Sequence, residues 1–221
     1  MKNKLNILYE DNHVIVVVKE PNILSQGDAT GDIDLLTMVK EYIKEKYNKP
    51  GNVYVGLVHR LDRPVGGVMV FAKSSKAASR LSEDIKNHKN FTKKYLLVCE
   101  GTFKDKEGEF TDKLEKLDNG NTVISPKGKI STLKYKVLDE KDNLSLVEVE
   151  LITGRHHQIR VQFSSRNHPL YGDARYGNYT GDNICLYAYK LSFMHPTLKE
   201  IKEFINYPNL NDNGWKKFDI I

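Results

Sequence analysis

A short stretch of charged residues around one carboxylate has the residue types of a reaction centre. The segment HRLDRPVGG, residues 59–67, places Asp62 between Arg60 and Arg63 and ahead of a Pro-x-Gly-Gly turn. Proline fixes its own φ and glycine permits backbone angles that other residues avoid, so the loop is predicted to be tight. Two nearby guanidiniums favour the ionised carboxylate, which can act as a nucleophile or a base. A surface salt bridge on a turn fits the same pattern, so these residues alone leave both interpretations open.

A second charged residue, Arg160, lies in the segment RHHQIRVQFSSR, residues 155–166, which is predicted to form a helix. Ile159 and Phe163 are one turn apart and mark its buried face. A guanidinium near the N-terminal end of a helix gains nothing from the helix dipole, so a specific anionic partner is expected, and Asp62 is the candidate. Taken alone, such an arginine equally fits a phosphate contact or another salt bridge.

Positive charge is concentrated in the segment that follows the Asp62 loop. The whole chain has 34 Lys and Arg against 29 Asp and Glu, a net charge of +5. Residues 73–94 hold two acids and seven cations, and so have the same net charge: Lys73, Lys76, Arg80, Lys86, Lys89, Lys93 and Lys94. A local positive field suits a polyanion such as nucleic acid, although a solvated helix face explains many such runs.

The periodicity of the apolar residues predicts the elements that carry these groups. Strands are expected at 7–19 (as a hairpin), 67–73, 94–101, 131–138, 144–152 and 184–191. Helices are expected after Asp34 and after Ser74 or Ser75, each of which is a plausible N-cap. Long loops are expected at 21–34 and 169–177, and a polar hairpin insertion at 104–129. The acid loop is therefore followed by a strand, a basic helix and a second strand.

Size and composition bound the class of protein. The 221 residues, 29% charged and 39% hydrophobic, fit a single domain over residues 1–221. The longest apolar run, Val14 to Val18, is too short to cross a bilayer, and no signal peptide is recognisable, so the protein is expected in the cytoplasm. Cys99 and Cys185 each lie in an apolar segment and are predicted to be buried thiols. The adjacent His156 and His157 lack a second ligand pair, so no metal site is expected.

Four ordered blocks resemble the RluA-type family of RNA pseudouridine synthases, which isomerise uridine to pseudouridine within RNA. They are HRLDRPVGG at 59–67, KYLLVCEG at 94–101, TGRHHQIRVQF at 153–163 and HPLYGDARYG at 168–177. The likeness extends from ILYEDNHVIVVVKEPN near the start to Pro208 and Trp215. It implies an α+β fold with a central mixed, mainly antiparallel sheet and flanking helices, and it implies no cofactor.

The resemblance also implies roles for individual residues. Asp62 matches the catalytic aspartate, Arg160 the arginine that pairs with it, and Tyr95 the tyrosine that lies against the target base. Arg60 matches an arginine that enters the RNA where the base has left in some members. A larger set is predicted to contact RNA: Arg60, Arg63, Lys73, Lys76, Arg80, Lys93, Lys94 and Arg155. Without the resemblance, a strand tyrosine such as Tyr95 is more often a core residue.

Several positions depart from the family pattern. Gly66 stands where the family usually has serine, and His156 where it usually has threonine, but both lie beside the implied catalytic residues. Residues 19–22, Lys-Glu-Pro-Asn, replace the usual K-P-x-G. The chain starts directly with the strands of the catalytic domain, so an N-terminal S4-type module is not expected and recognition is expected to rest on this one domain.

The chemistry implied by the resemblance needs no redox group and no group donor. The C1′–N1 bond of uridine breaks, the uracil turns, and C5 joins C1′. A carboxylate can either attack C1′ or remove the neighbouring sugar proton, and the sequence leaves both routes open. Ribosomal and transfer RNA are both open as substrates, and a monomer is expected. Two alternatives are a non-catalytic RNA-binding module and a nucleoside or glycoside hydrolase that uses Asp62.

Overall fold

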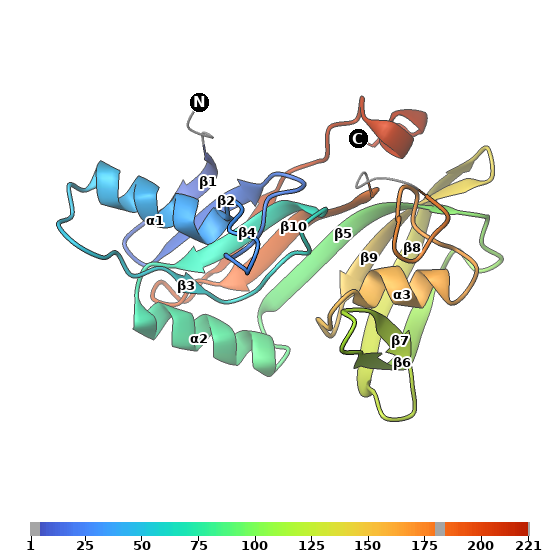
Figure 1. Cartoon of the computed structure of the whole chain (residues 1–221), viewed down its shortest axis with the longest axis horizontal. Coiled ribbons are helices and arrows are strands. Elements are labelled where there is room, and N and C mark those ends of the chain that lie inside the picture. Colours follow the sequence, from blue (N-terminus) through green and yellow to red (C-terminus); the bar gives the residue numbers. More distant parts are fainter. Residues whose placement is uncertain (1–4, 180–183, 221) are drawn as a thin grey trace. The chain divides into compact units, whose positions relative to one another are not determined.

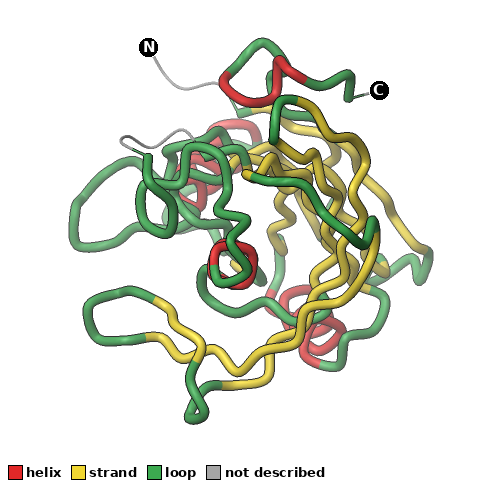
Figure 2. Tube along the Cα trace, turned by 90° about the vertical axis from the view of Figure 1, so that its right-hand side faces the viewer, coloured by secondary structure: helices red, strands yellow, loops and turns green. Residues whose placement is uncertain are grey.

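A computed structural model of the chain describes residues 5–179 and 184–220 (Figure 1). These residues form eleven β-strands and three α-helices. Strands occupy more of the trace in Figure 2 than helices do. The chain divides into two compact units, unit 1 (Met1–Phe91 and Lys190–Asn206) and unit 2 (Thr92–Tyr189 and Tyr207–Ile221). This division into compact units does not test the expectation of a single catalytic domain over residues 1–221, which stays a prediction.

The strands of unit 1 form around two buried segments of hydrophobic residues. Strand β2 (Val14–Lys19) pairs antiparallel with β1 (Asn6–Glu10) and with β4 (Gly66–Ala72), in a register that sets Val14 opposite Ala72. All residues of β2 and β4 are buried, as the unbroken apolar runs predict. Three further pairings complete this part of the sheet: β3 (Gly56–Leu57) on β4, β10 (Leu186–Met194) on β4, and β11 (Ile201–Ile205) on β10.

Two amphipathic helices flank the strands of unit 1 (Figure 1). Helix α1 (Leu35–Lys46) begins at Asp34, whose side chain accepts the Thr37 N–H at 3.0 Å. Helix α2 (Ser75–Lys86) begins at Ser74, whose hydroxyl accepts the Ala77 N–H at 3.2 Å. Both caps agree with the sequence prediction. The buried face of α2 packs against one face of the sheet, in a cluster of buried residues: Val14, Val16, Val68, Val70, Ala72, Ala77, Leu81, Leu191 and Phe193.

Glu10 joins α1 to the sheet and makes the fold sensitive to acid. Burial alone would raise the pKa of Glu10, but hydrogen bonds from four side chains outweigh it and lower the pKa to about 2: Lys46, Lys73, Tyr47 and Tyr42. Because the folded pKa lies below the ordinary value of 4.5, the stabilisation is complete above about pH 4.5 and is lost as the pH falls towards 2.

We therefore expect Glu10→Gln to lower the free energy of unfolding at pH 6 and to lose this effect near pH 2. Urea titrations across this pH range measure the difference. The control is Glu203→Gln, since Glu203 forms an exposed pair with Lys190 and such pairs contribute little. An effect of Glu10→Gln that is independent of pH would contradict the assignment.

Unit 2 contains an antiparallel sheet in the order β5-β9-β8-β6-β7. Its strands are β5 (Phe91–Glu100), β6 (Glu107–Lys116), β7 (Thr122–Ile124), β8 (Lys129–Lys141) and β9 (Leu144–Leu151). The register sets Tyr95 opposite Val149 and Lys94 opposite Glu150. Six of the seven residues of helix α3 (Gln158–Ser164) are buried. The predicted α+β fold, with a mainly antiparallel sheet, flanking helices and a hairpin insertion, is confirmed.

The structure corrects the start of one helix and adds two elements near the C-terminus. The helix expected from residue 155 begins only at Gln158, because His157 has a left-handed backbone (φ 51°) that cannot continue a helix. The C-terminal segment contains β11 and a short 3₁₀-helix (Asn213–Lys217) in which Trp215 is buried. Alternation of isoleucine with charged residues in IKEFI was the signal for β11. Cys99 and Cys185 are buried free thiols, as predicted.

Within the described ranges, every helix is too short or too polar to span a membrane.

Candidate active site

The backbone of the Asp62 loop in unit 1 is held by buried side chains. Ser25 Oγ donates to the Leu61 carbonyl at 2.7 Å and accepts the Leu61 N–H at 3.0 Å. The Asp62 carbonyl accepts the Val65 N–H at 3.0 Å, which closes the predicted turn. Leu61 is buried and the Asp62 side chain is half-buried. The loop thus holds its carboxylate on a fixed backbone, as a reacting group requires.

Lys19 supports the same loop from the end of β2. Its side chain is fully buried, and its ammonium donates to the carbonyls of Glu20 at 3.1 Å, Ile23 at 2.5 Å and Arg63 at 3.0 Å. Burial lowers the pKa of Lys19 to about 7, against the opposing effect of the Asp62 charge. Lys19 therefore connects the loop at residues 20–23 with Arg63, the residue that follows Asp62.

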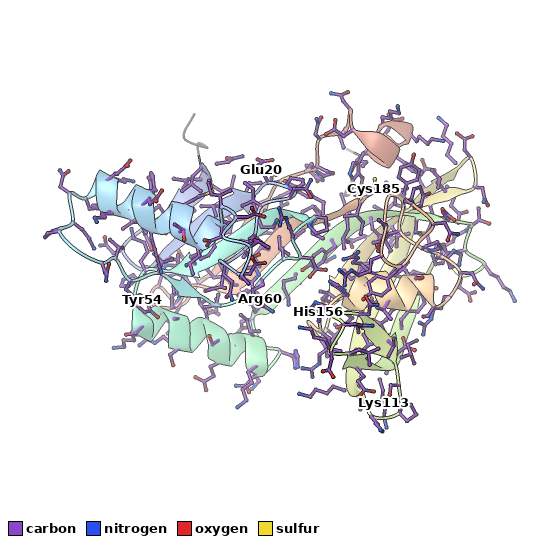
Figure 3. The ribbon with its side chains drawn as sticks, in the orientation of Figure 1. Glu20, Tyr54, Arg60, Lys113, His156 and Cys185 are labelled. Carbon is purple, nitrogen blue, oxygen red and sulfur yellow. The ribbon has the colours of Figure 1, made fainter. Side chains whose placement is uncertain are left out.

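The two arginines that flank Asp62 are exposed. Arg60 lies on the loop that precedes β4 (Figure 3), and its side chain is open to solvent. Arg63 forms an ion pair with Asp32 at 2.7 Å in which both side chains are about half-exposed. Exposed pairs of this kind are weak, so a polyanion can displace Asp32 from Arg63 at little cost.

The predicted basic face of unit 1 is only partly available. Lys76 is exposed, but Arg80 donates to the Pro196 carbonyl at 2.6 Å. Lys73 is held by Glu10 at 2.6 Å, and its side chain is only 9% exposed. Lys73 and Arg80 thus have structural partners, and direct RNA contacts from them stay predictions.

Tyr95 and its neighbours lie on β5 in unit 2. The Tyr95 side chain is 6% exposed. Lys94 pairs with Glu148 of β9 at 2.8 Å, and Glu148 also accepts the Tyr189 hydroxyl. Because successive strand residues point to opposite faces, Lys93 and Tyr95 share the face opposite to Lys94. Burial lowers the pKa of the half-buried Lys93.

Arg160 is held by a buried carboxylate of its own unit, Asp173. Arg160 Nε donates to Asp173 Oδ2 at 2.8 Å, and Nη2 donates to Oδ1 at 2.6 Å. The two side chains are 7% and 0% exposed. The guanidinium lies over the Tyr176 ring at 5.1 Å from its centroid. These contacts fix the plane of the guanidinium. The bonds to Asp173 use Nε and Nη2, and Nη1 takes no part in them.

The two histidines before α3, His156 and His157, make hydrogen bonds. His157 Nδ1 lies 2.7 Å from the Tyr176 hydroxyl, which also accepts the Thr122 N–H at 2.9 Å. His156 Nδ1 lies 2.9 Å from Thr122 Oγ1, and the histidine rings stack (Figure 3 labels His156). Burial and the neighbouring Arg160 lower the pKa of His157 to about 2, so this imidazole is neutral. Its role is to hold Tyr176 beneath Arg160.

Four supporting residues were not singled out from the sequence: Lys19, Ser25, Asp173 and Tyr176. Asp173 and Tyr176 belong to the block HPLYGDARYG. Asp173 is the only acid of this block, so the sequence did offer a signal for a partner of Arg160. Ser25 had no signal, because its bonds to Leu61 join segments 36 residues apart. Asp62 and Arg160 belong to different units, and the pair expected between them stays a prediction.

The two units supply different chemical groups, with Asp62 in unit 1 and Tyr95 and Arg160 in unit 2. Asp62 offers a nucleophile or base, Tyr95 an aromatic face, and Arg160 a rigidly held positive charge. No group of three or more His, Cys, Asp or Glu side chains suited to a metal ion occurs in residues 5–179 and 184–220.

Comparison with known sequences identifies a family. The model of the RNA pseudouridylate synthase family matches residues 13–165. An uncharacterised RNA pseudouridine synthase of Bacillus subtilis is 34% identical over 207 residues, which cover 90% of this chain and 67% of the relative. A ribosomal large subunit pseudouridine synthase C of Vibrio parahaemolyticus is 31% identical over 215 residues, which cover 91% and 65% of the two chains. The chain thus spans about two thirds of the length of these relatives.

Comparison with solved structures gives the same fold. Human RNA pseudouridylate synthase domain containing 4 matches with a TM-score of 0.76 and 22% identity, over 91% of this chain and 88% of that one. Human RNA pseudouridylate synthase domain containing 1 matches with a TM-score of 0.74 and 24% identity, over 95% and 85%. Because the sequence identities are 22% and 24%, these matches establish the fold and nothing further.

Proposed function

Since the chain belongs to the RNA pseudouridylate synthase family, and is an RNA-modifying isomerase, we propose that Asp62 is the residue at which it converts uridine to pseudouridine. The observation that carries this assignment is a carboxylate on a loop whose backbone is bonded on both sides, by Ser25 at Leu61 and by Lys19 at Arg63. Such a loop keeps a reacting oxygen in place while the base leaves and returns.

The reaction exchanges one bond to the sugar for another. Asp62 either attacks C1′ as the C1′–N1 bond breaks, or removes the adjacent sugar proton. Uracil then turns within the site. As C5 bonds to C1′, Asp62 leaves C1′ or returns the sugar proton, C5 loses its proton, and N1 gains one. The atoms of the RNA are conserved, so no co-reactant and no cofactor is needed. Carboxylates perform comparable chemistry at the anomeric carbon in glycosidases.

Arg160 and Tyr95 are proposed as the partners of Asp62. An arginine beside the carboxylate would keep it ionised and orient it. The Asp173 pair and the Tyr176 ring support this role because they hold Arg160 rigidly. Tyr95 is proposed to lie against the uracil, since an aromatic face can hold a planar base while it rotates.

The exposed cations are proposed to bind and open the RNA. Extrusion of a uridine from structured RNA costs a few kcal/mol, which phosphate contacts can offset. Arg60, exposed on the Asp62 loop, is proposed to fill the space that the base leaves. Arg63 and Lys76 are exposed as well and are proposed as phosphate contacts.

The proposed substrate is large-subunit ribosomal RNA, supported by the relatives named for it, with transfer RNA as the second candidate. The enzyme is proposed to act in the cytoplasm as a monomer.

The product identifies the reaction. We expect the purified protein to form pseudouridine in an unmodified large-subunit ribosomal RNA transcript without release of uracil, because isomerisation conserves mass. Nucleoside analysis by mass spectrometry after digestion detects both products. Free uracil together with abasic sites would instead support a hydrolase, and binding without either product would support a non-catalytic RNA-binding module.

A further inference from the structure

Lys93 and Arg155 of unit 2 both lie at the turn that contains Gly154, and neither has a partner in the described part of the chain. Lys93 Nζ approaches Gly154 so closely that a Cβ added there would lie 2.9 Å from it. Arg155 follows directly and is exposed. Neither side-chain cation has a hydrogen bond or ion pair with any residue in 5–179 or 184–220. Both cations thus lie at one turn without a counter-charge, and an anion bound there would neutralise them.

The acids of the neighbouring strand do not neutralise Lys93. Glu148 and Glu150 of β9 alternate with Val149 and point to the face of Lys94, which pairs with Glu148. Lys93 lies on the opposite face, which it shares with Tyr95, and burial lowers the pKa of its ammonium. A half-buried ammonium in an apolar setting normally has a counter-ion, and the chain supplies none here.

The turn that carries Arg155 is rigid and contains a further donor. Gln158 Oε1 accepts from Thr153 Oγ1 at 2.8 Å and from the Arg155 N–H at 3.0 Å, and Thr153 Oγ1 accepts the Thr132 N–H at 2.8 Å. Gln158 is only 2% exposed, and its Nε2 has no acceptor among the described residues. Because buried donors almost always find acceptors, an orphan donor here suggests an acceptor that comes from outside the chain.

The spacing of Lys93 and Tyr95 along β5 relates the turn to the target base, which is proposed to lie against Tyr95. Lys93 and Tyr95 are two residues apart on one face, roughly 6.6 Å along the strand. This separation is comparable with that between a base and the phosphate of its own nucleotide. An anion held at Lys93 would thus belong to the nucleotide whose base lies against Tyr95.

We propose that Lys93 and Arg155, on the turn fixed by Gln158, form a binding site for a backbone phosphate at the target nucleotide of the RNA. The proposal rests on the proposed function, because Tyr95 defines the position of the target base. Gly154 belongs to the site because a Cβ there would lie 2.9 Å from Lys93 Nζ and would displace the ammonium from the turn. The site orients the extruded nucleotide and contributes to affinity rather than to the chemical step.

The test measures RNA binding without turnover, in an Asp62→Asn background. Lys93→Met removes the charge and keeps the length of the side chain, and Lys113→Met removes one exposed charge from β6 of the same unit (Figure 3). The probe is an unmodified transcript of the Bacillus subtilis large-subunit ribosomal RNA. Affinities are measured from about 50 to about 200 mM salt, since each phosphate contact contributes about 0.7 to 0.9 to the slope of log affinity against log salt.

We expect Lys93→Met to weaken binding about tenfold and to lower the salt slope by nearly one contact. Lys93→Arg should restore both, whereas Lys113→Met should change affinity by less than about twofold. Equal effects of Lys93→Met and Lys113→Met, or an unchanged salt slope for Lys93→Met, would overturn the site. The proposed function is judged separately, by pseudouridine formation in the protein with Asp62 intact.

Discussion

Replacement of Asp62 by asparagine is expected to abolish isomerisation and to leave RNA binding within about threefold. Asparagine has nearly the same shape, so the Ser25 and Lys19 bonds to the neighbouring backbone can persist. Its amide is neither a nucleophile nor a base at this position, and loss of such a group lowers rates by about 10³-fold or more. Pseudouridine formed per unit time in the ribosomal RNA transcript measures the first effect, and equilibrium RNA binding measures the second.

Asp28→Asn is the matched control, since Asp28 is exposed in the same unit and its hydrogen bonds stay within its own loop, to Thr30. It should leave the rate within about twofold, as surface substitutions usually do. If Asp62→Asn still forms pseudouridine at a rate close to that of the parent, the carboxylate mechanism is wrong and another group must carry the reaction.

Removal of the buried partner of Arg160 should have the second large effect, on both stability and rate. Asp173→Asn removes the negative charge from the residue that holds the Arg160 guanidinium, whose side chain is 7% exposed. Breaking one side of a buried pair costs about 3–5 kcal/mol, because the remaining charge stays desolvated. The rate at saturating RNA should fall about a hundredfold, since small displacements of a positioning group have effects of this size. Urea denaturation and the pseudouridine assay measure the two effects.

The chain contains a control pair with the same chemistry. Arg166 contacts Asp112 through two bonds, at 2.9 and 3.1 Å, but the Arg166 side chain is 31% exposed. Asp112→Asn should therefore cost only about 1 kcal/mol, because solvent screens the unpaired charge. Equal losses of stability in the two variants would show that burial of Arg160 does not set the strength of its pair.

Local features of the fold were predictable because their causes are local. The hairpin at 7–19, the caps Asp34 and Ser74, and the strands at 67–73 and 144–152 follow from apolar periodicity and from side chains that bond to nearby backbone. The start of α3 was misjudged because apolar spacing cannot reveal the left-handed backbone at His157. The sequence also did not reveal which basic residues are exposed to solvent. Lys73, for example, pairs with Glu10 instead.

The sequence by itself determined the family, through four ordered blocks, and the residues proposed to react, Asp62, Tyr95 and Arg160. Only the tertiary structure decided what holds them: Ser25 and Lys19 around the acid loop, and Asp173 and Tyr176 around Arg160. The reason is physical. A motif records which side chains are present, whereas hydrogen bonds and ion pairs between distant segments depend on how the strands and loops pack, and the spacing of residues along the chain does not encode that packing.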